Sequence, residues 1–272
     1  MKWDQILIAS DIDGTLLPGG REIPERNLSA LRRFAEKGGH FTLATGRSIG
    51  SAGQFLDRLP VNAPAICLNG ALLYDYEQKK VLESCPLAKE TAAPLLKQLY
   101  DRFPTLGMEC FYQDSIGIVR RTSYIKNTKT PELYSFTDGT ETACFAPWMK
   151  LFFGGEPALV QEAMAFAETL PHDGLRYVFS SENYLEILPS GANKGKLLHK
   201  LAAYLEIPLA QVYAIGDFYN DEELLQAAGH AVVPANAPEQ LQKQAELVVC
   251  SCTDGALADL VEYLEQLCSN CP

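Results

Sequence analysis

The chain has 272 residues, of which 47% are hydrophobic and 21% charged, as in an ordinary globular protein. Its net charge is −11 at pH 7, and it carries no long run of Lys and Arg. This balance excludes a nucleic-acid partner bound through its phosphates. No apolar stretch approaches the length of a membrane span, and residues 1–5 lack the pattern of a secretory signal. We therefore expect no membrane partner and a cytoplasmic location.

Short apolar strands alternate with amphipathic helices at both ends of the chain. A helix should begin at Pro24 and end at Gly38–Gly39, because apolar residues recur on one face between them. The predicted strands are 5–10, 40–44, 64–68, 211–215, 230–233 and 246–249. Further helices are predicted at 193–205, 220–229 and 237–245. Near-continuous apolar strands divided by helices predict an α/β fold with a Rossmann-like, doubly wound parallel sheet covered on both faces.

The middle of the chain has a different pattern. Two hairpins are predicted, one at 106–119 and one at 175–188, with a strand at 148–153 and a helix at 158–170. Paired hairpins with helices are typical of an α+β module. We therefore predict a core domain made of residues 1–83 and 190–272, with an α+β domain inserted at 84–189, hinges included.

Polar side chains follow the predicted strands of the core. In an open parallel sheet, the groups at the carboxyl ends of the strands meet at one edge, where ligands bind. The groups expected at this edge are Asp11 and Asp13, the run Thr45–Gly46–Arg47, Lys194 at the start of a helix, and Gly216–Asp217 with Asn220 and Asp221. They span more than 200 residues of sequence.

Each of these groups also has a simpler interpretation. An aspartate in a strand-to-helix loop often caps the helix, and Lys194 could be an exposed lysine that opposes the helix dipole at small cost. Capping explains one aspartate, but it does not explain Asp11, Asp13, Asp217 and Asp221 together. Clustered carboxylates repel one another unless a cation joins them, and hard oxygen ligands favour Mg²⁺. Asp11 and Asp13, two residues apart in extended chain, should point the same way.

Eight cysteines are best interpreted as reduced thiols, most of them buried. The pairs Cys250/Cys252 and Cys268/Cys271 raise the alternative of a zinc site. That alternative is weaker, because the first pair has an unusual spacing for zinc and the second lies at the end of the chain.

Four segments, "DIDGTLL", "LATGRS", "NKGKLL" and "GDFYND", occur in this order and resemble the four motifs of the haloacid dehalogenase superfamily. The spacing and the insertion point resemble its Cof-type phosphatase branch, which carries a class II cap of the B subtype. The segment "PAICLNGALLYD" and the region from Val232 onward also fit that branch. The resemblance covers the core domain, whereas the inserted domain matches in layout more than in residues.

The resemblance implies a Mg²⁺-dependent phosphatase that acts on small phosphorylated metabolites, sugar phosphates above all, through an aspartyl phosphate. Asp11 would be the nucleophile, and Asp13 the general acid and base. The implied phosphate-binding residues are Thr45, Gly46, Lys194 and Asn220. The implied Mg²⁺ ligands are Asp11, the Asp13 carbonyl and Asp217. The implied supporting residues are Asp221, Arg47 and Asn69.

Two other functions stay open at this point. Phosphomannomutase-like phosphotransferases share the cap class and the first motif. A non-catalytic, phosphate-responsive binding protein is a second alternative, although it should have lost the nucleophile or the lysine. The sequence departs from the family at Phe218 and Tyr219, where smaller or polar residues are usual, and at Pro234. The substrate, the cap residues that select it and the oligomeric state do not follow from the sequence.

Overall fold

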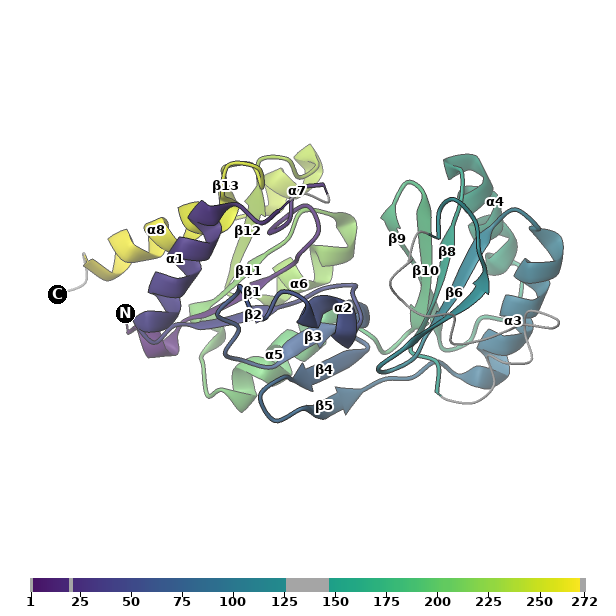
Figure 1. Ribbon diagram of the computed structural model, residues 1–272, viewed down its shortest axis with the longest axis horizontal. Helices are drawn as coiled ribbons and strands as arrows, with labels where there is room; N and C mark the ends of the chain where they lie inside the picture. The colour runs from purple at the N-terminus through teal and green to yellow at the C-terminus, as the bar shows by residue number, and fades with distance from the viewer. Residues whose placement is uncertain (1, 20–21, 126–146, 270–272) are drawn as a thin grey trace. The chain divides into compact units, whose positions relative to one another are not determined.

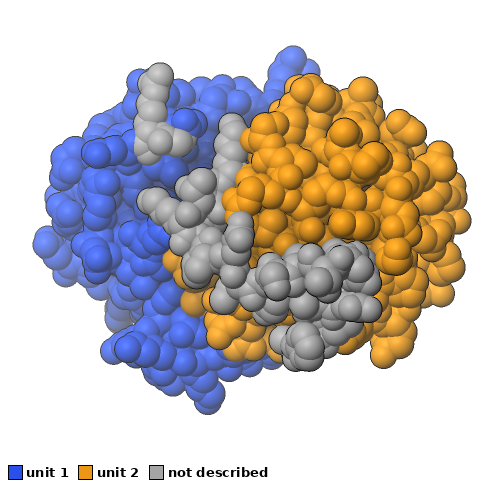
Figure 2. All heavy atoms as spheres, turned by 45° about the vertical axis from the view of Figure 1, so that its right-hand side comes forward, with its two compact units in different colours: residues 1–47, 51–83, 193–272 blue, residues 48–50, 84–192 orange. Residues whose placement is uncertain are grey.

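The computed structural model describes residues 2–19, 22–125 and 147–269. The chain divides into two compact units, shown in different colours in Figure 2. The first, here called the α/β unit, comprises residues 1–47, 51–83 and 193–272. The second, here called the inserted unit, comprises residues 48–50 and 84–192. Each unit has its own hydrophobic core, and the two are described separately.

A five-stranded parallel sheet forms the centre of the α/β unit (Figure 1). Its strands, in spatial order, are β13 (Leu247–Val249), β12 (His230–Pro234), β11 (Val212–Ile215), β1 (Leu7–Ser10) and β2 (His40–Leu43). Every neighbouring pair is parallel. The strands β1 and β11 are buried along their whole length, which explains why their sequences are apolar throughout. The predicted α/β fold with a parallel central sheet is confirmed.

Helices cover this sheet. They are α1 (Glu25–Glu36), α5 (Lys194–Tyr204), α6 (Glu222–Ala227), α7 (Glu239–Gln244) and α8 (Ala256–Ser269). A further short helix, α2 (Ile49–Gly53), begins with two residues of the inserted unit. Leucines of α5, α6 and α7 pack against Leu7, Ala9, Val212 and Ala214 of the strands. The helices α1 and α8 pack side by side (Figure 1). None of the helices in the described part of the chain is long and apolar enough to cross a membrane.

One predicted strand belongs to another sheet. Residues 64–68 were expected to extend the parallel sheet, but β3 (Ala65–Cys67) pairs antiparallel with β4 (Leu72–Asp75), and β5 (Lys80–Ser84) completes a three-stranded sheet. Within the described residues, the β-pairing between β3 and the parallel sheet is an isolated bridge between Ala44 and Ile66. The prediction was wrong because a tight turn at Leu68–Gly70, with all three residues at positive φ, reverses the chain without a crossover helix.

The inserted unit contains a five-stranded antiparallel sheet in the order β7-β6-β8-β10-β9. These strands are β6 (Gly107–Phe111), β7 (Ile116–Arg120), β8 (Lys150–Gly154), β9 (Leu175–Ser181) and β10 (Tyr184–Pro189). Helices α3 (Lys89–Arg102) and α4 (Pro157–Glu168) pack on the face that carries Leu151 and Leu185. That this unit acts as a cap on the active site stays a prediction.

The opposite face of this sheet carries buried charged groups. Glu109 and Glu186 both pair with Phe152 in the sheet, and Lys150 Nζ lies 2.7 Å from Glu186 Oε2. Glu109 is only 4% exposed, and its Oε1 has no hydrogen-bond partner among the residues that the structure describes. Burial raises the pKa of Glu109 to about 7, although the nearby charges of Lys150 and Arg121 act in the opposite direction.

This carboxyl predicts a pH-dependent stability. Between pH 4.5 and 7 the unfolded chain ionises Glu109 while the folded protein keeps it protonated, so the free energy of unfolding falls as pH rises. At about 1.4 kcal/mol per unit of pKa difference, the loss between pH 4.5 and 8 approaches about 3 kcal/mol. Urea unfolding of wild type and Glu109→Gln at pH 5 and pH 8 measures it. The variant should be the more stable protein at pH 8 and equal to wild type near pH 5, whereas exposed Glu162→Gln should follow wild type. The prediction would be contradicted if the free energy of unfolding changed equally between pH 5 and pH 8 in all three proteins.

The cysteines agree with the interpretation as reduced thiols. Among the described residues, six cysteines form no disulfide: Cys67, Cys85, Cys110, Cys250, Cys252 and Cys268. Of these, Cys67, Cys110 and Cys252 are buried. Cys144 and Cys271 lie outside the described residues. Within the described ranges, the group of side chains able to hold a metal ion consists of aspartates and includes no cysteine. The zinc alternative therefore has no support among the described residues.

Candidate active site

The site forms at the centre of the parallel sheet, where the order of the strands changes direction. The strand β2 lies on one side of β1, and β11, which comes much later in the sequence, lies on the other. Ligands bind at such a switch point, outside the carboxyl ends of the strands. Asp11 follows β1 directly and its N–H donates to the Ile215 carbonyl at 2.9 Å. Asp217 follows β11 after one glycine. The two carboxylates therefore emerge side by side, as the sequence predicts.

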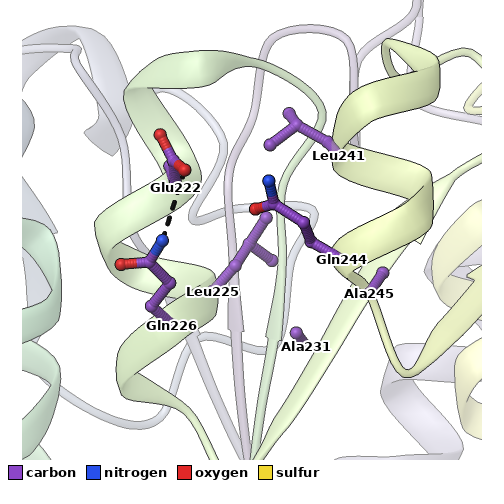
Figure 3. A pocket seen from close by; sticks show the side chains of 7 residues that line it. All are labelled: Glu222, Leu225, Gln226, Ala231, Leu241, Gln244 and Ala245. Atoms are coloured by element: carbon purple, nitrogen blue, oxygen red, sulfur yellow. Dashed lines mark hydrogen bonds between the residues drawn. The ribbon is translucent and has the colours of Figure 1, made fainter.

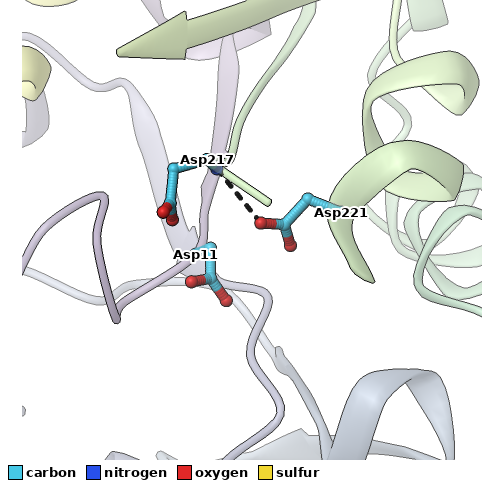
Figure 4. A group of neighbouring side chains, drawn as sticks. All are labelled: Asp11, Asp217 and Asp221. Atoms are coloured by element: carbon cyan, nitrogen blue, oxygen red, sulfur yellow. Dashed lines mark hydrogen bonds between the residues drawn. The ribbon is translucent and has the colours of Figure 1, made fainter. Parts of the chain in front are cut away.

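Three carboxylates turn toward one another at this edge (Figure 4). Asp11, Asp217 and Asp221 each offer an oxygen within 4.8 Å of the others. Asp221 is fully buried, and its Oδ2 accepts from the N–H groups of Asp217 and Phe218 at 3.2 and 3.4 Å. This contact holds the loop that carries Asp217. Asp221 is therefore placed to orient its neighbours as much as to bind a ligand.

Lys194 lies between two of these carboxylates. Its Nζ is 3.1 Å from Asp11 Oδ1 and 2.6 Å from Asp221 Oδ1, and the side chain is completely buried. Burial alone would lower the pKa of Lys194, but the two carboxylates outweigh it and raise the pKa above its usual value. Lys194 therefore stays charged, and the alternative of an exposed lysine is wrong.

A glycine explains how Lys194 reaches this position. Gly70 has φ +86°, and a Cβ there would lie 2.4 Å from the Lys194 nitrogen and 2.2 Å from the Asn193 carbonyl carbon. Only glycine allows the turn after β3 to approach the start of α5 so closely. Asn193 caps the helix, its Oδ1 accepting from the Lys196 N–H at 2.8 Å. The turn that reverses the chain into β4 thus also locates the start of α5.

Burial perturbs the carboxylates. It raises the pKa of Asp11 well above the usual range; Asp221 adds to the rise and Lys194 opposes it. Burial and the charge of Asp221 likewise raise the pKa of Asp217 to about 7, while a hydrogen bond from Thr15 Oγ1 at 2.9 Å opposes the shift. In the absence of a further cation, burial thus favours the protonated forms of Asp11 and Asp217. A positive charge placed among them would restore the ionised forms.

The residues present fit a divalent cation. Within the hydrogen-bonded cluster of the described residues, the carboxylates of Asp11, Asp13, Asp217 and Asp221 face two basic side chains, Lys194 and Arg47. Two negative charges are therefore left for one divalent ion to balance. The all-oxygen donor set suits Mg²⁺. Both oxygens of Asp221 already accept hydrogen bonds, which favours Asp11 and Asp217 as ligands.

The Asp13 carboxylate lies in different surroundings from that of Asp11. Its carboxylate accepts a bidentate pair from Arg47, Nε at 2.7 Å and Nη2 at 2.6 Å, and its side chain is 57% exposed. Asp11 and Asp13 differ in exposure and in partners, and that both reach one phosphoryl group stays a prediction. Asp11 lies in the buried cluster and Asp13 at its solvent side. Arg47, predicted as supporting, thus orients Asp13.

The other predicted residues are only partly brought together. Thr45 and Asn69 are both 1% exposed, and the Asn69 N–H donates to the Thr45 carbonyl at 3.1 Å. The absent side chain of Gly46 leaves room for the Asn69 amide, which a Cβ would approach to 3.1 Å. Asn220 lies in the short helix Tyr219–Asp221. Within the described part of the chain, no hydrogen bond joins its side chain to the other predicted residues.

Two residues of the site were not predicted from the sequence. Thr15 holds Asp217, and Asn236 donates from Nδ2 to the Gly14 carbonyl at 2.9 Å. Thr15 is part of the first motif, so its closeness to Asp11 in sequence could have identified it as a residue of the site. Asn236 stands 222 residues from Gly14 in sequence, and no local pattern indicates the contact.

A small pocket lies away from this cluster, between α6 and α7 (Figure 3). It is lined by Glu222, Leu225, Gln226, Ala231, Leu241, Gln244 and Ala245. Its volume of about 50 Å³ is well below the several hundred cubic ångströms of a metabolite site. The pocket is therefore not a candidate for the substrate.

Comparisons with known proteins agree with this geometry. Residues 8–261 match the model of the haloacid dehalogenase-like hydrolase family. The chain is 30% identical over 265 residues to a pyridoxal phosphate phosphatase of Escherichia coli, covering 94% of this chain and 97% of the relative.

Two solved structures share the fold. A haloacid dehalogenase-like hydrolase from Bacteroides thetaiotaomicron has a TM-score of 0.85 and 24% identity, over 95% of this chain and 99% of that one. A sugar phosphatase of haloacid dehalogenase subclass IIB has a TM-score of 0.81 and 17% identity, over 96% and 99% of the two chains.

Proposed function

Because the chain belongs to the haloacid dehalogenase-like hydrolase family, we propose that it hydrolyses phosphate monoesters of small metabolites through a phosphorylated Asp11. The family and the phosphatase class predicted from the four motifs are confirmed. The observation that carries the proposed mechanism is the buried contact between Asp11 and Lys194, with Asp217 and Asp221 beside it.

In the first proposed step, an Asp11 oxygen attacks phosphorus and the bond from phosphorus to the ester oxygen breaks. The leaving oxygen takes a proton from Asp13, which must first be released from its pair with Arg47 and protonated. The N–H groups and hydroxyl of the Thr45–Gly46 turn and the Lys194 ammonium would hold the phosphoryl oxygens, and Asn220 would support them.

In the second proposed step, a water molecule attacks the phosphorus of the acyl phosphate. Asp13 takes its proton, the bond from phosphorus to the Asp11 oxygen breaks, and inorganic phosphate leaves with Asp11 again a carboxylate. In the structure both Asp13 oxygens accept from Arg47, which is the arrangement of the ionised, base form.

Asp11, Asp217 and the Asp13 carbonyl would hold Mg²⁺, with Asp221 supporting the loop of Asp217. When bound, the ion would neutralise charge that develops on the transferred phosphoryl group. The lysine and the oriented loops would supply the rest of this electrostatic stabilisation.

The substrate class is proposed from the relatives. The names of the similar proteins include a pyridoxal phosphate phosphatase and a sugar phosphatase, so a small phosphorylated metabolite is the expected substrate. The chemistry above involves the phosphate alone. We therefore propose that the inserted unit, residues 84–192, selects the organic part of the substrate.

Phosphate release from p-nitrophenyl phosphate tests the function. Activity should depend on a divalent cation, be highest with Mg²⁺ and disappear in excess EDTA, because two negative charges of the cluster then lack a counter-charge. Glucose 1-phosphate and mannose 1-phosphate separate the alternatives. A phosphatase yields free phosphate in equal amount to the sugar, whereas a phosphotransferase yields an isomeric sugar phosphate. Full activity in EDTA would contradict the proposed metal dependence, and an absence of turnover with any phosphate ester would favour the binding protein.

A further inference from the structure

Asn236 joins three loops of the α/β unit through one carboxamide. It lies in the turn after β12, and its Nδ2 donates to the Gly14 carbonyl at 2.9 Å. Its Oδ1 accepts from the Cys252 N–H at 2.9 Å and from the Ser251 hydroxyl at 3.3 Å. Asparagine offers a donor and an acceptor on one rigid plane, as this double contact requires.

The loop that Asn236 holds is the one that carries the nucleophile. Gly14 has φ +85°, and its N–H donates to the Leu17 carbonyl at 3.0 Å. The Leu17 contact fixes the peptide that contains the Asp13 carbonyl. The Asn236 contact fixes the next peptide, between Gly14 and Thr15. Both peptides that flank Gly14 are thus held, each by a different partner.

This turn is in close contact with the Asp217 carboxylate. A Cβ on Gly14 would lie 2.2 Å from Asp217 Oδ2, so the carboxylate packs directly on the glycine backbone. Thr15, at the other end of the fixed peptide, donates to Asp217 Oδ1 at 2.9 Å. A rotation of this peptide would therefore displace Thr15 and the surface on which Asp217 rests.

We infer that Asn236 is a positioning residue for the metal site. It acts through Gly14 to fix the position of the Asp13 carbonyl relative to the Asp217 carboxylate. The inference rests on the proposed function, because these two groups are proposed ligands. It assigns to Asn236 an effect on metal affinity, which a residue that only links surface loops would not have. Partners of metal ligands typically change metal affinity by about 10- to 100-fold when they are removed.

The test uses three variants. Asn236→Ala removes all of the contacts. Asn236→Asp keeps an acceptor for Cys252 and Ser251 but cannot donate to Gly14, and it retains the size of the side chain. Gln242→Ala is the matched control, because Gln242 Nε2 donates to the carbonyls of Ala235 and Ala237 at 3.0 and 2.8 Å in the same turn and does not contact Gly14.

Two measurements are made on each full-length protein. Calorimetric titration with MgCl₂ in the absence of substrate gives the Kd for Mg²⁺. The steady-state kcat and KM for p-nitrophenyl phosphate are then measured over a range of Mg²⁺ concentrations.

Both Asn236 variants should raise the Kd for Mg²⁺ by about 10-fold. At saturating Mg²⁺ their KM for substrate should stay within about twofold of wild type, since the hydrogen bonds that the variants lose lie outside the phosphate site. Gln242→Ala should bind Mg²⁺ as wild type does.

The outcomes separate the inference from the proposed function. If wild type binds Mg²⁺ and both Asn236 variants bind it equally well, Asn236 only ties loops together and the inference is wrong. An effect of Asn236→Ala that Asn236→Asp does not share would place the cause in the Cys252 contact and would also overturn it. If wild type itself binds no Mg²⁺, the proposed metal dependence fails first.

Discussion

Asp11→Asn is expected to lower kcat by at least about 10³-fold while leaving the protein as stable as wild type or more stable. The amide cannot attack phosphorus, and it is a weaker metal ligand than the carboxylate. The stability expectation has an electrostatic reason. Burial and Asp221 raise the pKa of Asp11, so the folded protein disfavours a charge at this position. An amide removes that charge, and its oxygen can still accept from Lys194, whose Nζ lies 3.1 Å away.

Initial rates with p-nitrophenyl phosphate and thermal unfolding of the same samples measure both effects. Exposed Asp4→Asn is the control and should match wild type in both. Turnover of Asp11→Asn within tenfold of wild type would place the nucleophile elsewhere. A large loss of stability would show instead that the ion pair with Lys194 outweighs the carboxylate repulsion.

Lys194→Met is expected to have the largest effect on stability. The methionine fills similar space, but Asp11 and Asp221 are left buried without their cation. Removing one partner of a buried ion pair typically costs about 3–5 kcal/mol. At about 2–4 °C per kcal/mol, the Tm of the α/β unit should fall by roughly 10 °C. Turnover should also fall, because the proposed phosphate contact is lost.

The pH dependence identifies the cause of this loss. Protonation of the unpaired carboxylates removes the buried charge, so the Tm difference between wild type and Lys194→Met should shrink from pH 8 to pH 5. Lys196→Met is the matched control, since Lys196 is exposed in the same first turn of α5. The double variant Lys194→Met, Asp221→Asn should recover much of the lost stability. A Tm deficit that is equal at both pH values would contradict an electrostatic origin.

The strands and the cluster of aspartates were predictable because they depend on local sequence. An apolar run followed directly by a carboxylate marks the end of a buried strand, and a parallel sheet brings such ends together without further information. The positions of Asp11 and Asp217 after β1 and β11 follow this rule.

Contacts between distant segments were not predictable in this way. The burial of Lys194 depends on Gly70, whose turn packs on the start of α5 from 124 residues earlier in the chain. The pair between Asp13 and Arg47 joins residues that are 34 apart in sequence, and no local pattern indicates the contact. The strand β3 was misplaced for a related reason, because an apolar run does not reveal which sheet it joins.

The position of β1 between β2 and β11 has a consequence for synthesis on the ribosome. One edge of β1 stays unpaired until residues 212–215 have been made, more than two hundred residues later. Apart from the short segment 48–50, the inserted unit is one continuous stretch, residues 84–192. Its five strands are therefore synthesised before β11. Because domains fold as units during synthesis, the inserted unit can form while the central sheet still exposes an open, apolar strand edge. The nascent chain thus exposes this unpaired strand edge, which favours aggregation, during the interval between β2 and β11.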